Sequence, residues 1–415
     1  MKISYSKQDI LLTISIFIFT SYLFLIYFVE TDILNNTVLI QDGFYQRTLT
    51  KISGVFLLYF TLIRFFSIRI FLHNFPIKIP LLYYMITVIF ATPFLLLESN
   101  LVNRTFFDLE ANLYLMANNL VIFAPLLFLN FSGEKGDQLF TQLIKIIVWS
   151  VSIQLLLDLF LKFLNFQKIN TILGGMGNAN TFGLHLIIAA LGLRFIYHKY
   201  LLSSIVLIFT FGTGSLICIL ISILLLVQNI IFFVFRKSII FFLTFSFSLV
   251  ILIFFKDNLI FLFSSSFFST HGYLKLKGFF SEHIFELLSI KGRLYYIMEG
   301  LKMMIENPLS IIFGHPNFLL FFSGDFFYIT ILITLGAPTL LFFIISHIYL
   351  VFRGLNIKTP LFQFSSYTLI IYLIIFSTNR ILDYWPSGFM YLLVFTYLAT
   401  KNRNVKKKFI MVKNK

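Results

Sequence analysis

The chain has 415 residues, of which 59% are hydrophobic and 12% are charged, and its mean hydropathy is +0.93. This charged share is about half that of soluble globular proteins, which excludes an ordinary soluble domain. The net charge of +15 follows from the enrichment of Lys and Arg in the cytoplasmic loops of membrane proteins, so we expect no nucleic-acid partner. The sequence has no Walker-type glycine-rich loop that would indicate nucleotide hydrolysis.

Apolar runs recur along the chain, and most are long enough to cross about 30 Å of hydrocarbon as a helix. They predict an all-α, polytopic integral membrane protein with about twelve transmembrane helices in a single domain over residues 1–415. The first run has no small-residue cleavage site after it and is expected to be retained. The predicted helices are 10–29, 50–70, 80–97, 113–131, 140–161, 181–197, 200–212, 215–235, 239–255, 326–352, 361–378 and 386–400.

The charges between these helices predict their orientation, because loops rich in Lys and Arg stay in the cytoplasm. Two external loops are net acidic, whereas the loop Ser132 to Gln138 is slightly acidic although it is expected on the cytoplasmic side. Both termini are predicted to be cytoplasmic, and residues 401–415 form a basic tail. The basic residues expected in the cytoplasm before that tail include Lys2, Lys7, Arg64, Arg69, Lys78, Arg194, Lys199, Arg236, Lys237, Arg353 and Lys358.

Two segments depart from a plain series of spanning helices. Residues 200–235 must supply two helices with GTGS (212–215) as the turn, which leaves the first helix too short to span. This turn is therefore predicted to lie below the surface, against protein or in a cavity. The external loop 256–325 is long and contains an amphipathic helix, about 293–306, whose apolar residues fall on one stripe. Such a helix can lie along the outer membrane surface.

The segment GGMGNANTFG (174–183) precedes an apolar run and is rich in glycine and amide side chains. Glycines allow a close backbone approach, and the amides of Asn178 and Asn180 can donate or accept hydrogen bonds. The alternative is an ordinary loop with an Asn cap on the next helix. His185 follows inside the apolar run, where ionisable groups tend either to be satisfied by a neighbour or to face a cavity.

Three external cations are candidates for binding phosphate. Arg293, with Lys291 two residues before it, stands at the start of the amphipathic helix, where a cation gains nothing from the helix dipole. Arg380 lies in FSTNRILDYWPSG beside Trp385, and the planar guanidinium suits phosphate. The alternatives are a solvated loop cation for the first two and an interfacial anchor for Arg380.

Acidic residues and histidines suggest two further sites. His315 or Asp325, at the end of the long loop, could accept a hydroxyl proton at a shaped cavity, or Asp325 could cap the next helix. The carboxylate pairs in VETD (29–32) and FDLE (107–110) either bind a divalent metal or are solvated loop charges. No Cys/His metal spacing and no GxSxG motif occur in the sequence, and no metal or other cofactor is expected.

The order of these motifs resembles the O-antigen polymerase family, the Wzy-type membrane glycosyltransferases with a fold like that of GT-C enzymes, and their relatives the O-antigen ligases. The resemblance rests on GNAN opening a helix, the GTGS turn, an Arg-led external helix running into ENPLSIIFGHPN, and the Asp-led helix GDFFYITILITLGAPTLLF. One departure is that Ser215 is followed by Leu216, where relatives commonly have Ser-Arg.

The resemblance implies an enzyme of the bacterial inner membrane with a periplasmic active site. It would join undecaprenyl-pyrophosphate-linked oligosaccharides without a nucleotide sugar, in contact with membrane lipid and with a chain-length regulator as an expected partner. A ligase is the nearer alternative, but the His-Asn pair of ligases is replaced by Ser323-Gly324-Asp325; a lipid-linked oligosaccharide flippase is the other. The residues assigned to pyrophosphate are Arg293, Arg380 and Lys291, those assigned to catalysis are Asp325 and His315, and those assigned to substrate positioning are Gly177, Asn178, Asn180, His185 and Ser215.

Overall fold

The structure is a computed structural model and is helical almost throughout the residues it describes, in agreement with the predicted all-α class. The remaining regular structure in the described residues is an antiparallel pair of two-residue strands, β1 (Thr31–Asp32) and β2 (Thr37–Val38). The predicted helices 10–29, 50–70, 80–97 and 239–255, and all but the last residue of 113–131, lie outside the described residues. The residues described are 31–32, 37–38, 131, 133–163, 172, 179–235, 288–306, 308–313, 327–379, 387–388 and 390–401.

Two of the described helices are long and apolar enough to cross a membrane. They are α5 (Gly133–Phe163), through its segment Gly136–Phe160, and α16 (Ala337–Asn356). A helix that is apolar on all faces is typical of a buried core or a membrane span, and the exposed face of α16 is as apolar as its buried face. That exposed face carries Leu341, Phe342, Ile345, Ile348, Tyr349 and Phe352.

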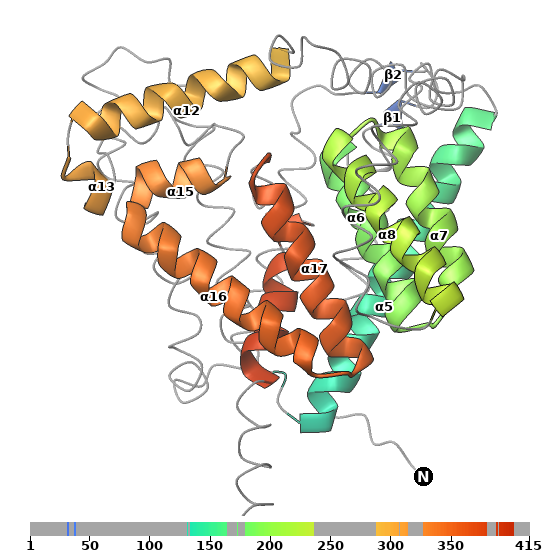
Figure 1. Cartoon of the computed structure of the whole chain (residues 1–415). Helices are drawn as coiled ribbons and strands as arrows, with labels where there is room; N and C mark the ends of the chain where they lie inside the picture. The colour runs from blue at the N-terminus through green and yellow to red at the C-terminus, as the bar shows by residue number, and fades with distance from the viewer. Residues whose placement is uncertain are drawn as a thin grey trace, which may run out of the picture. The chain divides into compact units, whose positions relative to one another are not determined.

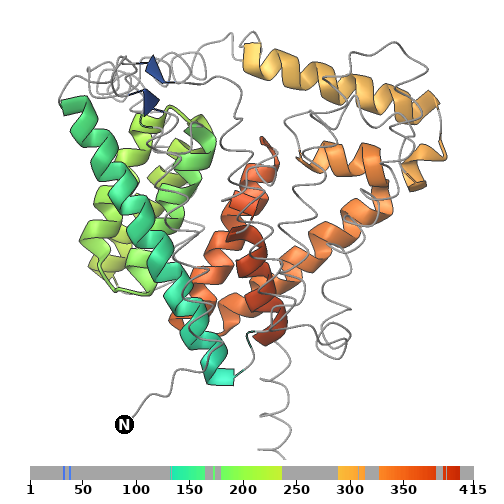
Figure 2. The ribbon, with the colours of Figure 1, turned by 180° about the vertical axis from the view of Figure 1, so that it is seen from behind.

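The chain divides into two compact units. The first comprises residues 1–18, 47–142 and 292–415, and the second comprises residues 19–46 and 143–291. Helix α5 contributes its first residues, up to Gln142, to the first unit and the rest to the second. The second unit contains α6 (Ala179–Phe195), α7 (Tyr200–Phe209) and α8 (Leu216–Phe235), which Figures 1 and 2 show packed together with α5 passing alongside.

The turn between α7 and α8 is buried, as the sequence predicts. Helix α7 ends after ten residues and continues as a 3-10 helix, η2 (Thr210–Thr213), before Gly214 adopts a left-handed conformation with φ 71°. Gly212, Thr213, Gly214 and Ser215 are all buried. The backbone N–H of Ile172 donates to the C=O of Gly212 at 2.7 Å, so protein groups satisfy part of this irregular backbone.

The predicted helix 326–352 is broken into two in the structure. Helix α15 (Phe327–Leu335) ends before Gly336, and α16 begins at Ala337. Gly336 has φ 83°, and a side chain there would collide with the backbone of Ile312 in α13 (Ser310–Phe313). Pro338 lies in the first turn of α16, where its missing N–H is tolerated, whereas one continuous helix would lose a hydrogen bond there.

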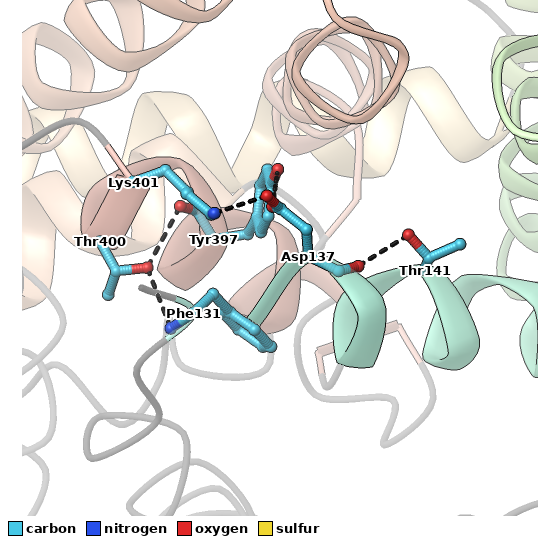
Figure 3. Close-up of polar contacts among 6 residues, drawn as sticks. All are labelled: Phe131, Asp137, Thr141, Tyr397, Thr400 and Lys401. Atoms are coloured by element: carbon cyan, nitrogen blue, oxygen red, sulfur yellow. Dashed lines mark hydrogen bonds and ion pairs between the residues drawn. The ribbon is translucent and has the colours of Figure 1, made fainter. Parts of the chain in front are cut away.

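Helix α5 begins at Gly133, so most of the predicted acidic loop 132–138 is helical. Its first turns carry a cluster that we call the charged cluster: Asp137 with Tyr397 and Lys401 from the terminal helix 390–401 (Figure 3). The Lys401 ammonium lies 2.6 Å from Asp137 Oδ2, and the Tyr397 hydroxyl donates to Oδ1 at 2.7 Å. The ring of Tyr397 also stacks on Phe140 of α5 at a centroid distance of 4.0 Å.

The interior of the first unit is built from aromatic side chains on α15, α16, α17 (Pro360–Phe376) and the terminal helix. His347 of α16 is fully buried, and its Nε2 lies 2.5 Å from the Tyr391 hydroxyl. Its Nδ1 lies 2.6 Å from the C=O of Phe343. Since a carbonyl only accepts, Nδ1 carries the proton and Nε2 accepts from Tyr391. This pair is a satisfied polar contact within an aromatic core.

Candidate functional site

The structure brings together two of the residues that the sequence assigns to substrate positioning. Ser215, before α8, donates its hydroxyl to Oδ1 of Asn180 in the first turn of α6, at 2.5 Å. The two residues lie 35 positions apart in the chain. The GNAN and GTGS motifs therefore meet at one place in the second unit, where the first turns of α6 and α8 come side by side.

Gly183 explains why α6 approaches η2 and α8 so closely. A Cβ atom at this position would lie 2.9 Å from both Cβ and Sγ of Cys218 and 3.2 Å from the Thr213 hydroxyl. No side chain fits at the first two distances, because real Cβ atoms do not approach so closely. Small residues at helix contacts let backbones approach in this way. The last glycine of GGMGNANTFG is thus a packing residue, and it keeps Asn180 within reach of Ser215.

A series of hydroxyl groups continues from Ser215 into the unit. Thr213 accepts from the Ser215 N–H at 3.3 Å and donates to the C=O of Thr210 at 2.8 Å. The Thr210 hydroxyl lies 2.6 Å from the C=O of Leu207 and 2.7 Å from the Ser222 hydroxyl. These residues are buried. Together with Asn180 they form what we call the neutral cluster: Asn180, Thr210, Thr213, Ser215 and Ser222.

His185 lies farther along α6 and is 2% exposed. Its Nδ1 lies 2.8 Å from the C=O of Thr181, so Nδ1 carries a proton and donates it to that carbonyl. The Ser215 hydroxyl is engaged by the Asn180 amide rather than by a histidine. A nucleophile needs a base within hydrogen-bond reach, and the Asn180 amide is not a base. The arrangement suits positioning of a hydroxyl-rich ligand rather than covalent catalysis.

The external amphipathic helix is α12 (Leu288–Glu306), which starts five residues before the predicted position. Lys291 and Arg293 are therefore within its first two turns, and Arg293 is not its first residue. Met304 packs against Ile333 of α15. The remainder of the predicted apolar stripe is largely uncovered in the structure, with Leu294, Met298, Leu301 and Ile305 exposed.

Several predicted site residues lie outside the described residues. They include the two assigned to catalysis, one of the three cations and two positions of the GNAN motif. Of this motif the structure describes Ala179, the first residue of α6, and Asn180. The residues outside the described part are Gly177, Asn178, His315, Asp325 and Arg380.

One buried acidic residue was missed by the sequence reasoning. Asp158 of α5 is 1% exposed, and Gln154 and Ser150, on the same face one and two turns before it, are fully buried. The signal was available, because Asp158 is the one carboxylate inside the apolar run 140–161. Ionisable residues within membrane helices face protein or cavities and mark functional positions.

Among the residues that the structure describes, no three His, Cys, Asp or Glu side chains lie together in a way that would hold a metal ion. No protein-family model, curated protein or solved structure matches the chain. The interpretation of the site therefore depends on its own geometry and on the motif resemblance.

Proposed function

We propose that the chain is an O-antigen polymerase. It transfers a glycan from one undecaprenyl pyrophosphate to a repeat unit on another, at the periplasmic face of the inner membrane. The observation that carries the proposal is the 2.5 Å hydrogen bond between Ser215 and Asn180. It joins the GNAN and GTGS motifs, each of which carries a residue assigned to substrate positioning, and it does so with neutral groups suited to sugar hydroxyls.

The reaction depends little on a protein nucleophile or a cofactor, because a polyprenyl pyrophosphate is already a good leaving group. The acceptor hydroxyl oxygen bonds to the anomeric carbon of the transferred glycan, and the bond from that carbon to the pyrophosphate oxygen breaks. The hydroxyl proton passes to a base, for which Asp325 or His315 is our candidate. In this proposal Arg293, Arg380 and Lys291 stabilise the departing pyrophosphate, and placing the acceptor supplies much of the remaining acceleration.

The charged cluster supports the proposed sidedness. Lys401, the first residue of the basic tail, is paired with Asp137 near the start of α5. Two residues in contact must lie on the same side of a membrane. The acidic segment 132–138, which departs from the charge bias, is therefore on the same side as the basic tail and pairs with its first cation. With both in the cytoplasm, α5 starts on the cytoplasmic side and runs outward, and the charge bias independently assigns the start of α6 to the periplasmic side.

The test is the lipopolysaccharide ladder of a strain that lacks the gene and is complemented with variants. Deletion is expected to leave a single repeat unit on the lipopolysaccharide core, and wild-type chain restores the ladder. Arg293→Ala and Arg380→Ala are expected to reproduce the loss, alone or together. If all three of these variants kept full-length ladders, the pyrophosphate assignment would be wrong.

The same gel separates the alternatives. Loss of a ligase leaves no O-antigen on the core, not even one unit. Loss of a flippase leaves lipid-linked repeat units on the cytoplasmic face. Retention of the wild-type ladder in the deletion strain would overturn the proposal of a polymerase altogether.

A further inference from the structure

A basic residue of α5 lies at the turn between α6 and α7. The Lys145 ammonium lies over the ring of Tyr197, 5.7 Å from its centroid, within the range at which a cation is attracted to an aromatic face. His198 and Lys199 directly follow Tyr197 in the turn. All three basic residues are exposed and belong to the second unit. We call Lys145, His198 and Lys199 the basic cluster.

The positive charge of the basic cluster is not neutralised within the part of the chain that the structure describes. Neither Lys145 nor Lys199 forms an ion pair there, and the ion pair that is described, Lys401 with Asp137, belongs to the first unit. Arg194, in the last turn of α6, is 3% exposed and donates to the neutral Oε1 of Gln228 at 3.0 Å. The two exposed lysines can therefore bind an anion from outside the chain.

His198 has a backbone conformation that favours glycine. Its φ is 55°, and it is the one residue other than glycine with a positive φ among those described. Helices commonly end with a glycine in this conformation, because glycine adopts it without steric cost. A side chain at such a position strains the backbone, and strain of this kind occurs at ligand-binding positions. A histidine here, where glycine fits more easily, favours a role for the imidazole.

The residues next to the basic cluster suit the boundary between lipid headgroups and hydrocarbon. Trp149 follows Lys145 by one turn on the same face of α5, and it is 62% exposed. Both lie within the apolar segment Gly136–Phe160. Tryptophan is enriched at this boundary, and a lysine in a membrane helix extends its ammonium toward the headgroups. After the turn, Leu201 and Leu202 of α7 are 76% and 49% exposed, so apolar surface adjoins the cations.

We propose that the basic cluster binds the headgroup of an anionic phospholipid in the cytoplasmic leaflet, the side on which the charge bias predicts this turn. The two ammonium groups attract the phosphate as point charges, and an imidazole N–H donates to it. The acyl chains lie against the exposed apolar side chains beside the turn. A free phosphate ion has no group for that apolar surface, which favours a lipid. This inference does not depend on the proposed polymerase function.

The experiment titrates the purified full-length chain, in detergent, with dioleoylphosphatidylglycerol and counts bound lipid by native mass spectrometry. A lysine near an anionic headgroup contributes about fivefold to affinity. Lys145→Gln and Lys199→Gln should each weaken binding about fivefold, and the double variant about thirtyfold. Lys302→Gln, which removes the charge of an exposed lysine on α12, is the matched control and should bind as wild type does.

His198→Gly separates lipid binding from folding. It should weaken lipid binding without lowering the thermal unfolding temperature of the lipid-free chain, because glycine adopts the backbone conformation of His198 without strain. Lipid binding equal to that of wild type would remove the imidazole from the proposed site.

Four results would overturn the inference. One is equal affinity of the double variant and wild type for phosphatidylglycerol; if the double variant fails to fold, equal affinity of both single variants decides in the same way. Another is equal affinity of wild type for dioleoylphosphatidylcholine, whose headgroup has no net charge. A third is a fivefold loss in Lys302→Gln, which would mean that any exposed cation holds the lipid. The last is a rise in unfolding temperature with inorganic phosphate that matches the rise with phosphatidylglycerol.

Discussion

The two units join their helices through polar clusters of different chemistry. In the first unit, the charged cluster pairs Asp137 with Lys401, and the Asp137 side chain remains 37% exposed. In the second, the neutral cluster uses an amide and hydroxyls, and Thr213 and Ser215 are at most 1% exposed. A charge removed from water loses much of its hydration energy, whereas a neutral hydroxyl with a partner loses little.

The difference shows where each chemistry can be used. A charge pair is suitable at the end of a helix, where water still reaches the carboxylate side chain. Full burial of an irregular turn needs groups that satisfy the backbone locally without a net charge. The following predictions test this comparison, from the largest expected effect to the smallest.

The charge bias predicts that the start of α5 is cytoplasmic and that α12 and the start of α6 are external. The one native cysteine, Cys218, is buried, so single introduced cysteines can be labelled against a low background. Glu134→Cys, near the charged cluster, should react with a membrane-impermeant maleimide only after the inner membrane is opened. Tyr295→Cys on α12 and Ala179→Cys at the start of α6 should react in spheroplasts. Labelling of Glu134→Cys in intact spheroplasts would contradict the assignment.

Gly183 is predicted to be the most sensitive packing position of the neutral cluster. Gly183→Val would force α6 away from Cys218 and Thr213, and overpacking of this kind costs about 1–3 kcal/mol. We expect a lower thermal unfolding temperature in detergent and loss of the polysaccharide ladder. Leu201→Phe adds bulk at an exposed position of α7 and serves as control. Equal stability of Gly183→Val and wild type would show that the close approach is not required.

A double-mutant cycle measures the charged cluster. Asp137→Asn and Lys401→Met should each lower the free energy of unfolding by about 1–3 kcal/mol, because a partly buried charge loses its partner. The double variant should lose less than the sum of the two, and the difference gives the coupling energy. A coupling energy of zero in detergent would mean that the pair only marks where the helices meet.

A substitution in the neutral cluster should affect polymerisation more than it affects the free energy of unfolding. Ser215→Ala removes one hydrogen bond to Asn180, worth about 1 kcal/mol, so the chain should fold. If the cluster positions glycan, the ladder should nevertheless shorten. The control is Ser152→Ala on α5, a residue outside this cluster whose hydroxyl donates to the backbone C=O of Val148 at 2.7 Å. A normal ladder with Ser215→Ala would restrict the cluster to a structural role.

The smallest change in the free energy of unfolding is expected for an exposed contact between a cation and a tyrosine. Arg353 donates to the Tyr349 hydroxyl at 2.7 Å on the exposed face of α16. Water competes with such contacts, so Arg353→Gln should change the free energy of unfolding by no more than about 0.5 kcal/mol. A loss as large as that of Lys401→Met would show that exposure does not separate the two contacts.

The helical class and most described helices were predictable, because apolar periodicity is local. The break at Gly336 was missed although Gly336 and Pro338 are visible in the sequence, since the apolar run continues across them. The early start of α5 was missed for another reason. Glu134 and Asp137 were interpreted as loop charges, and the partner that keeps Asp137 in a helix, Lys401, is 264 residues away. The contact of Asn180 with Ser215 joins residues 35 positions apart and was not predictable from local patterns. Asp158 was visible as the one carboxylate of the run 140–161, but its burial needed the structure.

The long separation in sequence between Asp137 and Lys401 also determines when their ion pair can form during synthesis of the chain. A ribosome makes Asp137 long before Lys401, so the start of α5 enters the membrane before its cation exists. The pair with Lys401 can form only after the terminal helix has been made. Closure of the charged cluster is thus a late step of biogenesis, after which the first helical turns of α5 are fixed against the end of the chain's last described helix.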